Sequence, residues 1–324
     1  MTTEGTIWDM HKPKLSVILP TYNRAPYLTR MLDSVLTQKF TEFELLLLNN
    51  GSTDEKTEGI CLSYADKDER IRFFSLPDNQ GPAPARNLGI REARAPYMIH
   101  VDDDDYCESD HFDLLYELIT KYNADIAISG CADEFEDEIR TKHQYEGVYV
   151  WDQAELVSEF LKRDKFHAAP ATKMYRTSLF EHVKYPTGVL VDDIHVTYRL
   201  IASCNKGVAH GRPTYRFFKH GENTTSFLET NHIWPDLLQE YLVMQSERVK
   251  YISERVPEEA AHVRYAAWSY MISMVEKIHL GRGPGCERQL QYMIDELYRN
   301  QKEFMEAPWF SEREHRLMRQ FILF

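Results

Sequence analysis

The sequence lacks the long apolar runs that membrane-spanning and secreted proteins carry. Its longest purely aliphatic run is Leu45–Leu48, whereas a helix needs about 20 apolar residues to cross a bilayer. No apolar stretch in Met1–Lys14 resembles a secretory signal peptide. These absences predict a cytoplasmic protein and leave open a peripheral contact with the inner face of the cell membrane.

Basic residues and paired cysteines are also scarce. The 38 lysines and arginines face 51 aspartates and glutamates, for a net charge of −13. Broad electrostatic binding to nucleic acid is therefore not expected. The five cysteines form no CxxC pair, a pattern typical of buried, reduced thiols in a cytosolic protein. The acidic excess leaves many carboxylates, which are the ligands of hard divalent cations.

The length of 324 residues favours two domains. Up to about residue 230, short apolar runs alternate with segments of helical periodicity, which predicts an α/β fold with a mostly parallel sheet flanked by helices. From about residue 231 the periodicity is helical throughout. We therefore predict an α/β domain in 1–230 and a C-terminal helical region in 231–324. The predicted strands are Leu15–Leu19, Phe43–Leu48, Ile71–Phe74, Tyr97–Val101 and Asp125–Ser129.

Four consecutive aspartates, Asp102–Asp105, follow the predicted strand Tyr97–Val101. Each close pair of carboxylates costs about 1 kcal/mol in water and several times more in a less polar site. A solvated loop is the usual explanation of such a run, but ligands of open α/β sheets bind at the carboxyl ends of strands. A Mg²⁺ ion held by one or two carboxylates and by substrate phosphates would relieve the repulsion. The second acidic run, residues 133–138, is predicted as a solvated loop.

Polar segments also follow the first two predicted strands, at Pro20–Arg24 and Asn50–Asp54. Because the carboxyl ends of parallel strands meet at one edge of a sheet, we expect these loops and the aspartates to form one crevice. A later helical segment carries Arg86 and Asn87, which could face a diphosphate. A salt bridge on the helix surface explains Arg86 equally well.

Four segments in register resemble the motifs of family 2 glycosyltransferases. They read SVILPTYNR, an apolar strand followed by NNGSTD, DNQGPAPARNLGI, and YMIHVDDDDY. The resemblance is close over about residues 14–130 and looser to about 226. It implies an A-type glycosyltransferase fold in which about 14–130 binds the nucleotide sugar and about 131–230 binds the acceptor. It also implies inverting transfer, from a UDP-sugar in particular, in bacterial surface-polysaccharide or cell-wall polymer synthesis.

The resemblance also implies roles for individual residues. Asp104 would bind Mn²⁺ or Mg²⁺ directly, with Asp102 at the other end of the DxD motif. His220 matches a position where some members place a histidine on the metal or the diphosphate, although a lone histidine after a strand is often structural. Asn50 stands where the family often has an aspartate facing the base. The residues implied in binding the nucleotide sugar are Pro20, Thr21, Tyr22, Asn23, Asn50, Arg86, Asn87, Asp102 and Asp103.

Asp193 is the candidate catalytic residue. The segment Val191–Ile194 resembles the Glu-Asp pair that opens a helix in the family, and its second carboxylate is the general base of inverting members. A sugar hydroxyl is a poor nucleophile until a carboxylate takes its proton in the transition state. The alternative is that Asp192 and Asp193 only complement the dipole of a helix over about 191–201.

These observations together predict a metal-dependent hexosyl- or N-acetylhexosaminyltransferase with a saccharide acceptor and no nucleic-acid partner. A sugar nucleotidyltransferase is the alternative enzyme, although PTYNR lacks the glycine-rich loop expected of one. A catalytically inactive nucleotide-sugar-binding module is the other alternative. The C-terminal helices show no catalytic motif, and their apolar stripes predict core packing or a homo-oligomer interface. The apolar terminus Phe321–Phe324 would dock on the protein, on another subunit or on a membrane.

Overall fold

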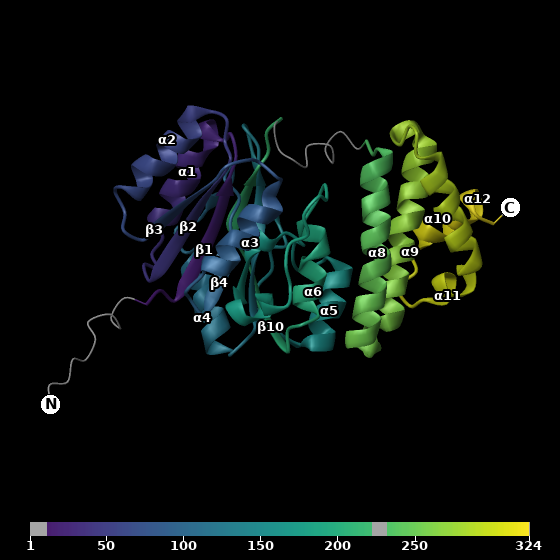
Figure 1. The fold of residues 1–324 in the computed structure, drawn as a ribbon. Coiled ribbons are helices and arrows are strands. Elements are labelled where there is room, and N and C mark those ends of the chain that lie inside the picture. Colours follow the sequence, from purple (N-terminus) through teal and green to yellow (C-terminus); the bar gives the residue numbers. More distant parts are fainter. Residues whose placement is uncertain (1–11, 222–231, 324) are drawn as a thin grey trace. The chain divides into compact units, whose positions relative to one another are not determined.

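The computed structural model describes residues 12–221 and 232–323, and the chain divides into two compact units, Met1–Lys219 and His220–Phe324 (Figure 1). The predicted boundary near residue 230 lies outside the described residues, as do most of Met1–Lys14 and the terminal Phe324. Within the described part of the chain, no helix is both long and apolar enough to cross a membrane.

The first unit is built on one ten-stranded sheet. Its first four strands are parallel, in the spatial order β3-β2-β1-β4. In its second part the long strands β6 and β10 are parallel to each other, and the short strands pair antiparallel with their neighbours. The predicted α/β fold is therefore confirmed. The strands are β1 (Leu15–Thr21), β2 (Phe43–Asn50), β3 (Ile71–Leu76), β4 (Tyr97–His100), β5 (Tyr106–Cys107), β6 (Ile126–Glu134), β7 (Ile139–Lys142), β8 (Val148–Asp152), β9 (Lys173–Arg176) and β10 (Lys206–Phe218).

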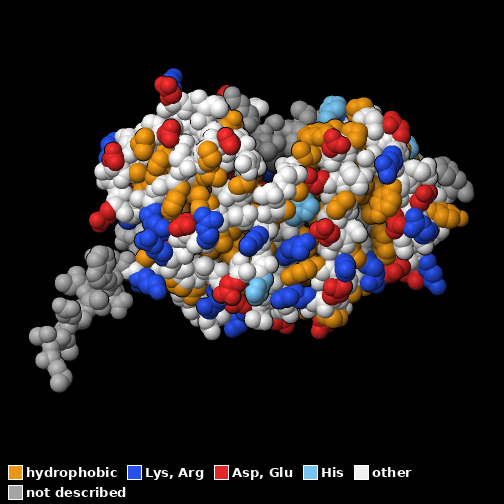
Figure 2. Space-filling view, in the orientation of Figure 1, with side chains coloured by type: hydrophobic (Ala, Val, Ile, Leu, Met, Phe, Trp, Pro, Cys, Tyr) orange, Lys and Arg blue, Asp and Glu red, His pale blue; other side chains and the backbone are white. Residues whose placement is uncertain are grey.

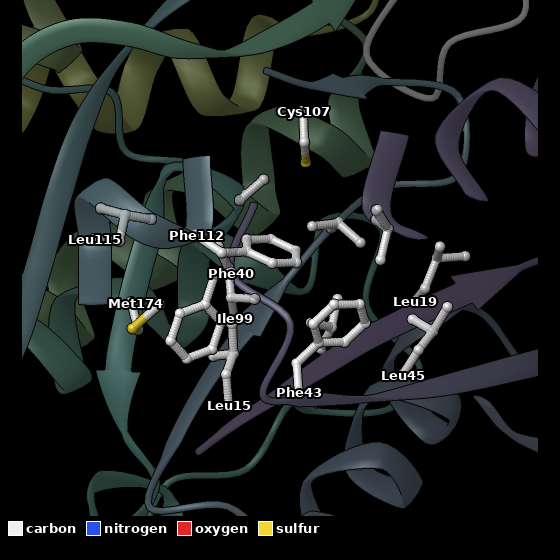
Figure 3. Packing of buried hydrophobic residues seen from close by; sticks show 14 of the residues in the cluster. Leu15, Leu19, Phe40, Phe43, Leu45, Ile99, Cys107, Phe112, Leu115 and Met174 are labelled. Atoms are coloured by element: carbon white, nitrogen blue, oxygen red, sulfur yellow. The ribbon is translucent and has the colours of Figure 1, made fainter. Parts of the chain in front are cut away.

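Helices cover both faces of the parallel part of the sheet. Alternate residues of β1, such as Val17, pack with α1, α2 and α4 in one core cluster, part of which Figure 3 shows. The opposite face of β1 and β2 meets α3, where the Cβ position of Gly89 lies 2.6 Å from Cγ2 of Ile18. Burial on both faces explains the continuous apolar run of β2. The helices are α1 (Ala25–Leu36), α2 (Glu55–Ala65), α3 (Pro82–Glu92), α4 (His111–Lys121), α5 (Gln153–Lys162) and α6 (Thr197–Ile201).

Some predicted boundaries need correction. Strand β1 runs through Pro20 to Thr21 because parallel pairing with β2 continues to that point. The predicted helix over 191–201 is only a 3-10 turn, Asp193–His195, followed by the short α6. The acidic run 133–138 is not wholly a solvated loop, since Asp133 and Glu134 end β6. Ion pairs with Lys142 and Arg30, respectively, offset these two charges.

The second unit is helical, as predicted. Its helices α8 and α9 pack together, and α10 and α12 pack on α9. The apolar end of the chain docks within this unit, where Ile322 is buried and the ring of Phe321 lies 4.4 Å from that of His279. The helices are α8 (Pro235–Arg255), α9 (Ala260–Lys277), α10 (Glu287–Arg299), α11 (Gln301–Glu306) and α12 (Glu312–Phe321).

The surface and the cysteines agree with the composition. On the face in view, Figure 2 shows basic and acidic side chains interspersed, with no continuous basic patch on that face. All five cysteines are buried free thiols, as predicted.

Gly51, which joins β2 to α2, supplies a test of the fold. Its backbone is left-handed (φ +69°), and a Cβ there would lie 2.4 Å from the carbonyl carbon of Asp78. We expect Gly51→Ala to lower the free energy of unfolding by about 1–3 kcal/mol in urea titration, because both the backbone and the contact are strained. The matched control is Gly59→Ala in α2, where a Cβ meets nothing within 4 Å. It should stabilise the protein by up to about 1 kcal/mol, and equal effects of the two changes would contradict the fold.

Candidate active site

The loops after β1 and β2 are tied together by Asn23. Its Oδ1 accepts hydrogen bonds from the backbone N–H groups of Thr53 (2.9 Å) and Asp54 (3.2 Å), and its own N–H donates to Oγ of Ser52 (3.1 Å). The backbone of Asn23 is left-handed, with φ 51°, a conformation that asparagine tolerates better than most residues. Asn23, one of the residues predicted to bind the donor, thus holds the loops after β1 and β2 together at the carboxyl edge of the parallel strands.

The loop after β1 also meets the aspartate run. The N–H of Tyr22 donates to Oδ2 of Asp103 at 3.3 Å, across 81 positions of sequence. Thr21, beside it, is buried at the end of β1. Pro20 lies one residue earlier, inside the part of β1 that pairs with β2. The structure therefore brings Thr21, Tyr22 and Asp103 together, as the sequence predicts.

Asn50 anchors the loop that leads into α3. Its Nδ2 donates to the carbonyl oxygen of Gly81 (2.8 Å) and to Oδ1 of Asn79 (3.2 Å). These two acceptors fix the orientation of the amide, and its Oδ1 is then a buried acceptor with no partner among the described residues. An ionised aspartate at this position would have no hydrogen to donate to the loop. These two hydrogen bonds give a structural reason for an amide, and not a carboxylate, at position 50, and the sequence did not reveal it.

The aspartates after β4 bring several carboxylates together in a mostly buried loop. The side chains of Asp103 and Asp104 are only 12% and 13% exposed, and Nε of Arg24 lies 3.7 Å and 3.8 Å from their oxygens. Burial and the charge of Asp104 raise the pKa of Asp103 to about 7. Burial likewise raises the pKa of Asp102, although Arg86 opposes it. Arg24, within the quoted PTYNR motif, was missed as a site residue.

The fourth aspartate, Asp105, has a different part. Its oxygens accept hydrogen bonds from the hydroxyl of Tyr215 (2.8 Å) and the N–H of Phe218 (2.9 Å), both on β10. Burial, with the charges of Asp104 and Asp102, raises its pKa well above the ordinary value. Asp105 therefore fastens the aspartate loop to β10, and these contacts set it apart from the first three aspartates.

Arg86 is buried between two carboxylates from distant elements, rather than in a salt bridge on the helix surface. Its Nη1 lies 2.5 Å from Oδ1 of Asp192, and its Nη2 lies 3.1 Å from Oδ1 of Asp102. Burial alone would lower the pKa of Arg86, but the charges of Asp192 and Asp102 raise it well above its ordinary value. Nε of Arg86 and Oδ2 of Asp192 have no partner among the described residues.

Asn87, the neighbour of Arg86 on α3, has its amide occupied. Its Nδ2 donates to the carbonyl oxygen of Tyr185 (2.8 Å), and its Oδ1 accepts from the N–H of Tyr185 (3.0 Å). The ring of Tyr185 lies 5.4 Å from the guanidinium carbon of Arg86. Asn87 therefore braces the segment that supports Arg86.

Asp193 lies beside this ion-pair network. It begins the 3-10 turn before α6 and is partly buried. Burial raises its pKa to about 6; Arg86 opposes the shift, and Asp192 and Asp102 add to it. The side chain of Asp192 makes no capping hydrogen bond, so its partner is Arg86 and not a helix end. A carboxylate with this pKa is ionised at neutral pH and more basic than an ordinary aspartate, which suits a general base.

Lys173, on β9, is a further group that sequence reasoning did not place in the site. It is fully buried, and its Nζ donates to the carbonyl oxygens of His167 (2.5 Å) and Ala169 (2.7 Å). Burial lowers its pKa to about 7, against the charge of Asp193. His220, the predicted metal or diphosphate ligand, lies two residues beyond β10 and is partly buried.

The aspartate loop suits a cation whose remaining ligands are substrate phosphates and water. In residues 12–221 and 232–323, no three or more His, Cys, Asp or Glu side chains form a metal-binding group. Three carboxylates that follow one another in a mostly buried loop, Asp102–Asp104, nevertheless favour a divalent cation, which would offset their mutual repulsion. Mg²⁺ is commonly held by one or two carboxylates and completed by phosphates and water, and it needs no protein cage.

Comparison with known proteins places these residues in context. A family model described as Glycosyl transferase family 2 matches residues 16–184, just over half of the 324 residues. Glycosyltransferase GlyA of Streptococcus pneumoniae is 30% identical over 214 residues, which are 63% of this chain and 30% of GlyA. A teichoic acid poly(glycerol phosphate) polymerase of Staphylococcus epidermidis is 38% identical over 92 residues, which are 28% of this chain and 13% of the polymerase. The chain thus spans less than half the length of either relative.

Among solved structures, S. aureus TarS 1-349 in complex with UDP-GlcNAc superposes with a TM-score of 0.68. The match covers 94% of this chain and 83% of the TarS chain, at 21% sequence identity. At that identity the likeness concerns the fold, and it confirms the predicted fold class, including the C-terminal helical region.

Proposed function

The chain belongs to glycosyl transferase family 2, and from this premise we propose that it is an inverting, metal-dependent glycosyltransferase with a nucleotide-diphosphate sugar as donor. Two contacts carry the proposal: the loops after β1, β2 and β4 meet through Asn23 and Asp103, and Arg86 joins Asp102 to Asp192, the neighbour of Asp193. That arrangement puts carboxylates for a cation, an arginine and a candidate base at the carboxyl edge of one parallel sheet, where ligands of α/β folds bind.

The proposed donor is a UDP-sugar, with a hexosyl or N-acetylhexosaminyl group. Two observations support this choice: the family of the chain, and a fold like that of TarS, whose structure is a complex with UDP-GlcNAc. Thr21, Tyr22 and Asn50 would face the base and Asp103 the ribose. Arg86, Asn87, Asn23 and Pro20 would shape the rest of the donor site. We propose Asn50 as the residue to examine for base selection, since its Oδ1 is unused.

Asp104 and Asp102 would hold Mn²⁺ or Mg²⁺. A role for His220, the first residue of the second unit, stays a prediction. A bound divalent cation would supply neutralisation of the charge that develops on the departing diphosphate. The chain contributes the carboxylates, and Arg24 and Arg86 limit their mutual repulsion.

Asp193 would act as the general base. Its carboxylate takes the proton of the acceptor hydroxyl while the hydroxyl oxygen bonds to the anomeric carbon. The bond from that carbon to the diphosphate oxygen breaks in the same displacement, so the configuration inverts. Because the carboxyl must be ionised to accept a proton, activity is expected to fall as the pH drops through the pKa of Asp193, about 6.

The proposed acceptor is a saccharide or a polymer of the bacterial surface or cell wall. One relative, the polymerase of S. epidermidis, is named for a teichoic acid, which supports this class without identifying the acceptor. A peripheral membrane contact and a homo-oligomer through the C-terminal helices stay predictions.

The metal assignment is tested by calorimetry of UDP with and without Mn²⁺. We expect Mn²⁺ to raise the affinity of the wild type for UDP by at least about tenfold, because bare carboxylates and a diphosphate repel each other. Asp104→Asn should lose this gain. The matched control is the neighbour Asp105→Asn, which keeps an oxygen for the N–H of Phe218 and should retain the gain. The metal assignment would be contradicted if Mn²⁺ still raised the UDP affinity of Asp104→Asn, or did not raise that of the wild type.

The base assignment is tested by Asp193→Asn, which keeps the shape and removes the basic oxygen. General-base assistance contributes about 10²–10⁴-fold, so kcat for transfer should fall by at least about a hundredfold, while UDP affinity in Mn²⁺ changes by no more than a few-fold. In the wild type, kcat plotted against pH should fall on the acid side near pH 6, and this fall is called the acid limb. It should disappear with the activity in Asp193→Asn. Turnover within about threefold of the wild type would return Asp193 to a structural role.

A further inference from the structure

We infer that Asp192 is a positioning residue that keeps Arg86 engaged, so that Arg86 does not pair directly with the neighbouring Asp193 carboxylate, which stays basic. The inference rests on the proposed function, because it assigns Asp192 a part in the same transfer reaction. The resemblance to the family assigns the proton transfer to Asp193 and gives Asp192 no part in it. The structure separates them by their contacts.

The ion pair of Asp192 with Arg86 is short and buried. Nη1 of Arg86 lies 2.5 Å from Oδ1 of Asp192, and the two side chains are only 11% and 6% exposed. A pair so shielded from solvent is screened little by salt. Removing one partner of a buried pair is costly because it leaves an uncompensated charge. If Asp192 lost its charge, we therefore expect the guanidinium of Arg86 to pair with another carboxylate.

Asp193, the residue that follows Asp192 in the chain, would supply that carboxylate. Arg86 stays anchored at its other end by Asp102, at 3.1 Å from Nη2, and the ring of Tyr185 supports its face. Only the Nη1 end would need a new partner, and Asp193 is the adjacent residue. A direct pair with arginine favours the ionised carboxylate, lowers its pKa and makes it a weaker base.

The other charged and titratable groups around Asp193 do not take this part. Asp102, at the end of β4, already shares Arg86 and raises the pKa of Asp193. Lys173 donates to the carbonyl oxygens of His167 and Ala169. Burial raises the pKa of the Tyr175 and Tyr185 hydroxyls, which keeps both neutral at working pH. Asp192 is thus the group whose loss would redirect Arg86.

The test is the pH profile of kcat for Asp192→Asn, measured with the full chain. We expect kcat at neutral pH to fall about tenfold and the acid limb to move about one pH unit lower, since an opposite charge shifts a carboxyl pKa by about 1–3 units. UDP affinity in Mn²⁺ should stay within about threefold. The control, Asp68→Asn, breaks another partly buried pair, Asp68–Arg70 at 2.6 Å, and should leave the limb in place.

A conservative variant keeps the inference testable if Asp192→Asn does not fold. Asp192→Glu retains the carboxylate, so it should pair with Arg86 and hold the acid limb at the wild-type pH. A limb that moves to lower pH in Asp192→Glu would overturn the inference, as would wild-type kcat and an unmoved limb in folded Asp192→Asn. Either result leaves the proposed function intact if Asp193→Asn is still inactive. An active Asp193→Asn would instead reject the base assignment itself.

Discussion

The structure depends on holding like charges together at one edge of a sheet. Asp102, Asp103 and Asp104 follow β4, and Asp192 and Asp193 reach the same place from a distant segment. The arginines in direct contact with these carboxylates are Arg24 and Arg86. Burial raises the pKa of Asp103 and of Asp193, and the neighbouring carboxylates raise both further. Binding of a cation and a phosphorylated donor, as proposed, would relieve the repulsion between these carboxylates.

The fold supplies the rigidity that this arrangement needs. Buried runs of β1 and β2, covered on both faces, fix where their carboxyl ends lie. Amide side chains then connect the loops: Asn23 joins the first two, Asn50 holds the loop before α3, and Asn87 braces Tyr185 under Arg86. Asn23 and Asn87, which the resemblance predicts in the donor site, also form part of the frame that positions the neighbouring loops.

The sequence allowed the parallel strands and the meeting of their polar loops with the aspartates to be predicted, because apolar runs ending in polar turns determine where each strand stops. It did not allow the short antiparallel strand β9 to be predicted between β4 and β6, since that pairing joins segments far apart in the chain. The resemblance gave Asp105 no role, and only the contacts with β10 show what it does. Arg24 was missed as a site residue because its partners, Asp103 and Asp104, lie far from it in the sequence.

The most direct test of the central claim, that this edge binds and activates a nucleotide sugar, is a donor screen. Release of free nucleotide from a panel of UDP- and GDP-sugars is measured with Mn²⁺ and without acceptor. The account predicts slow hydrolysis of at least one UDP-sugar, lost with EDTA and in Asp104→Asn. A folded protein that neither hydrolyses nor binds any nucleotide sugar in Mn²⁺ would contradict it.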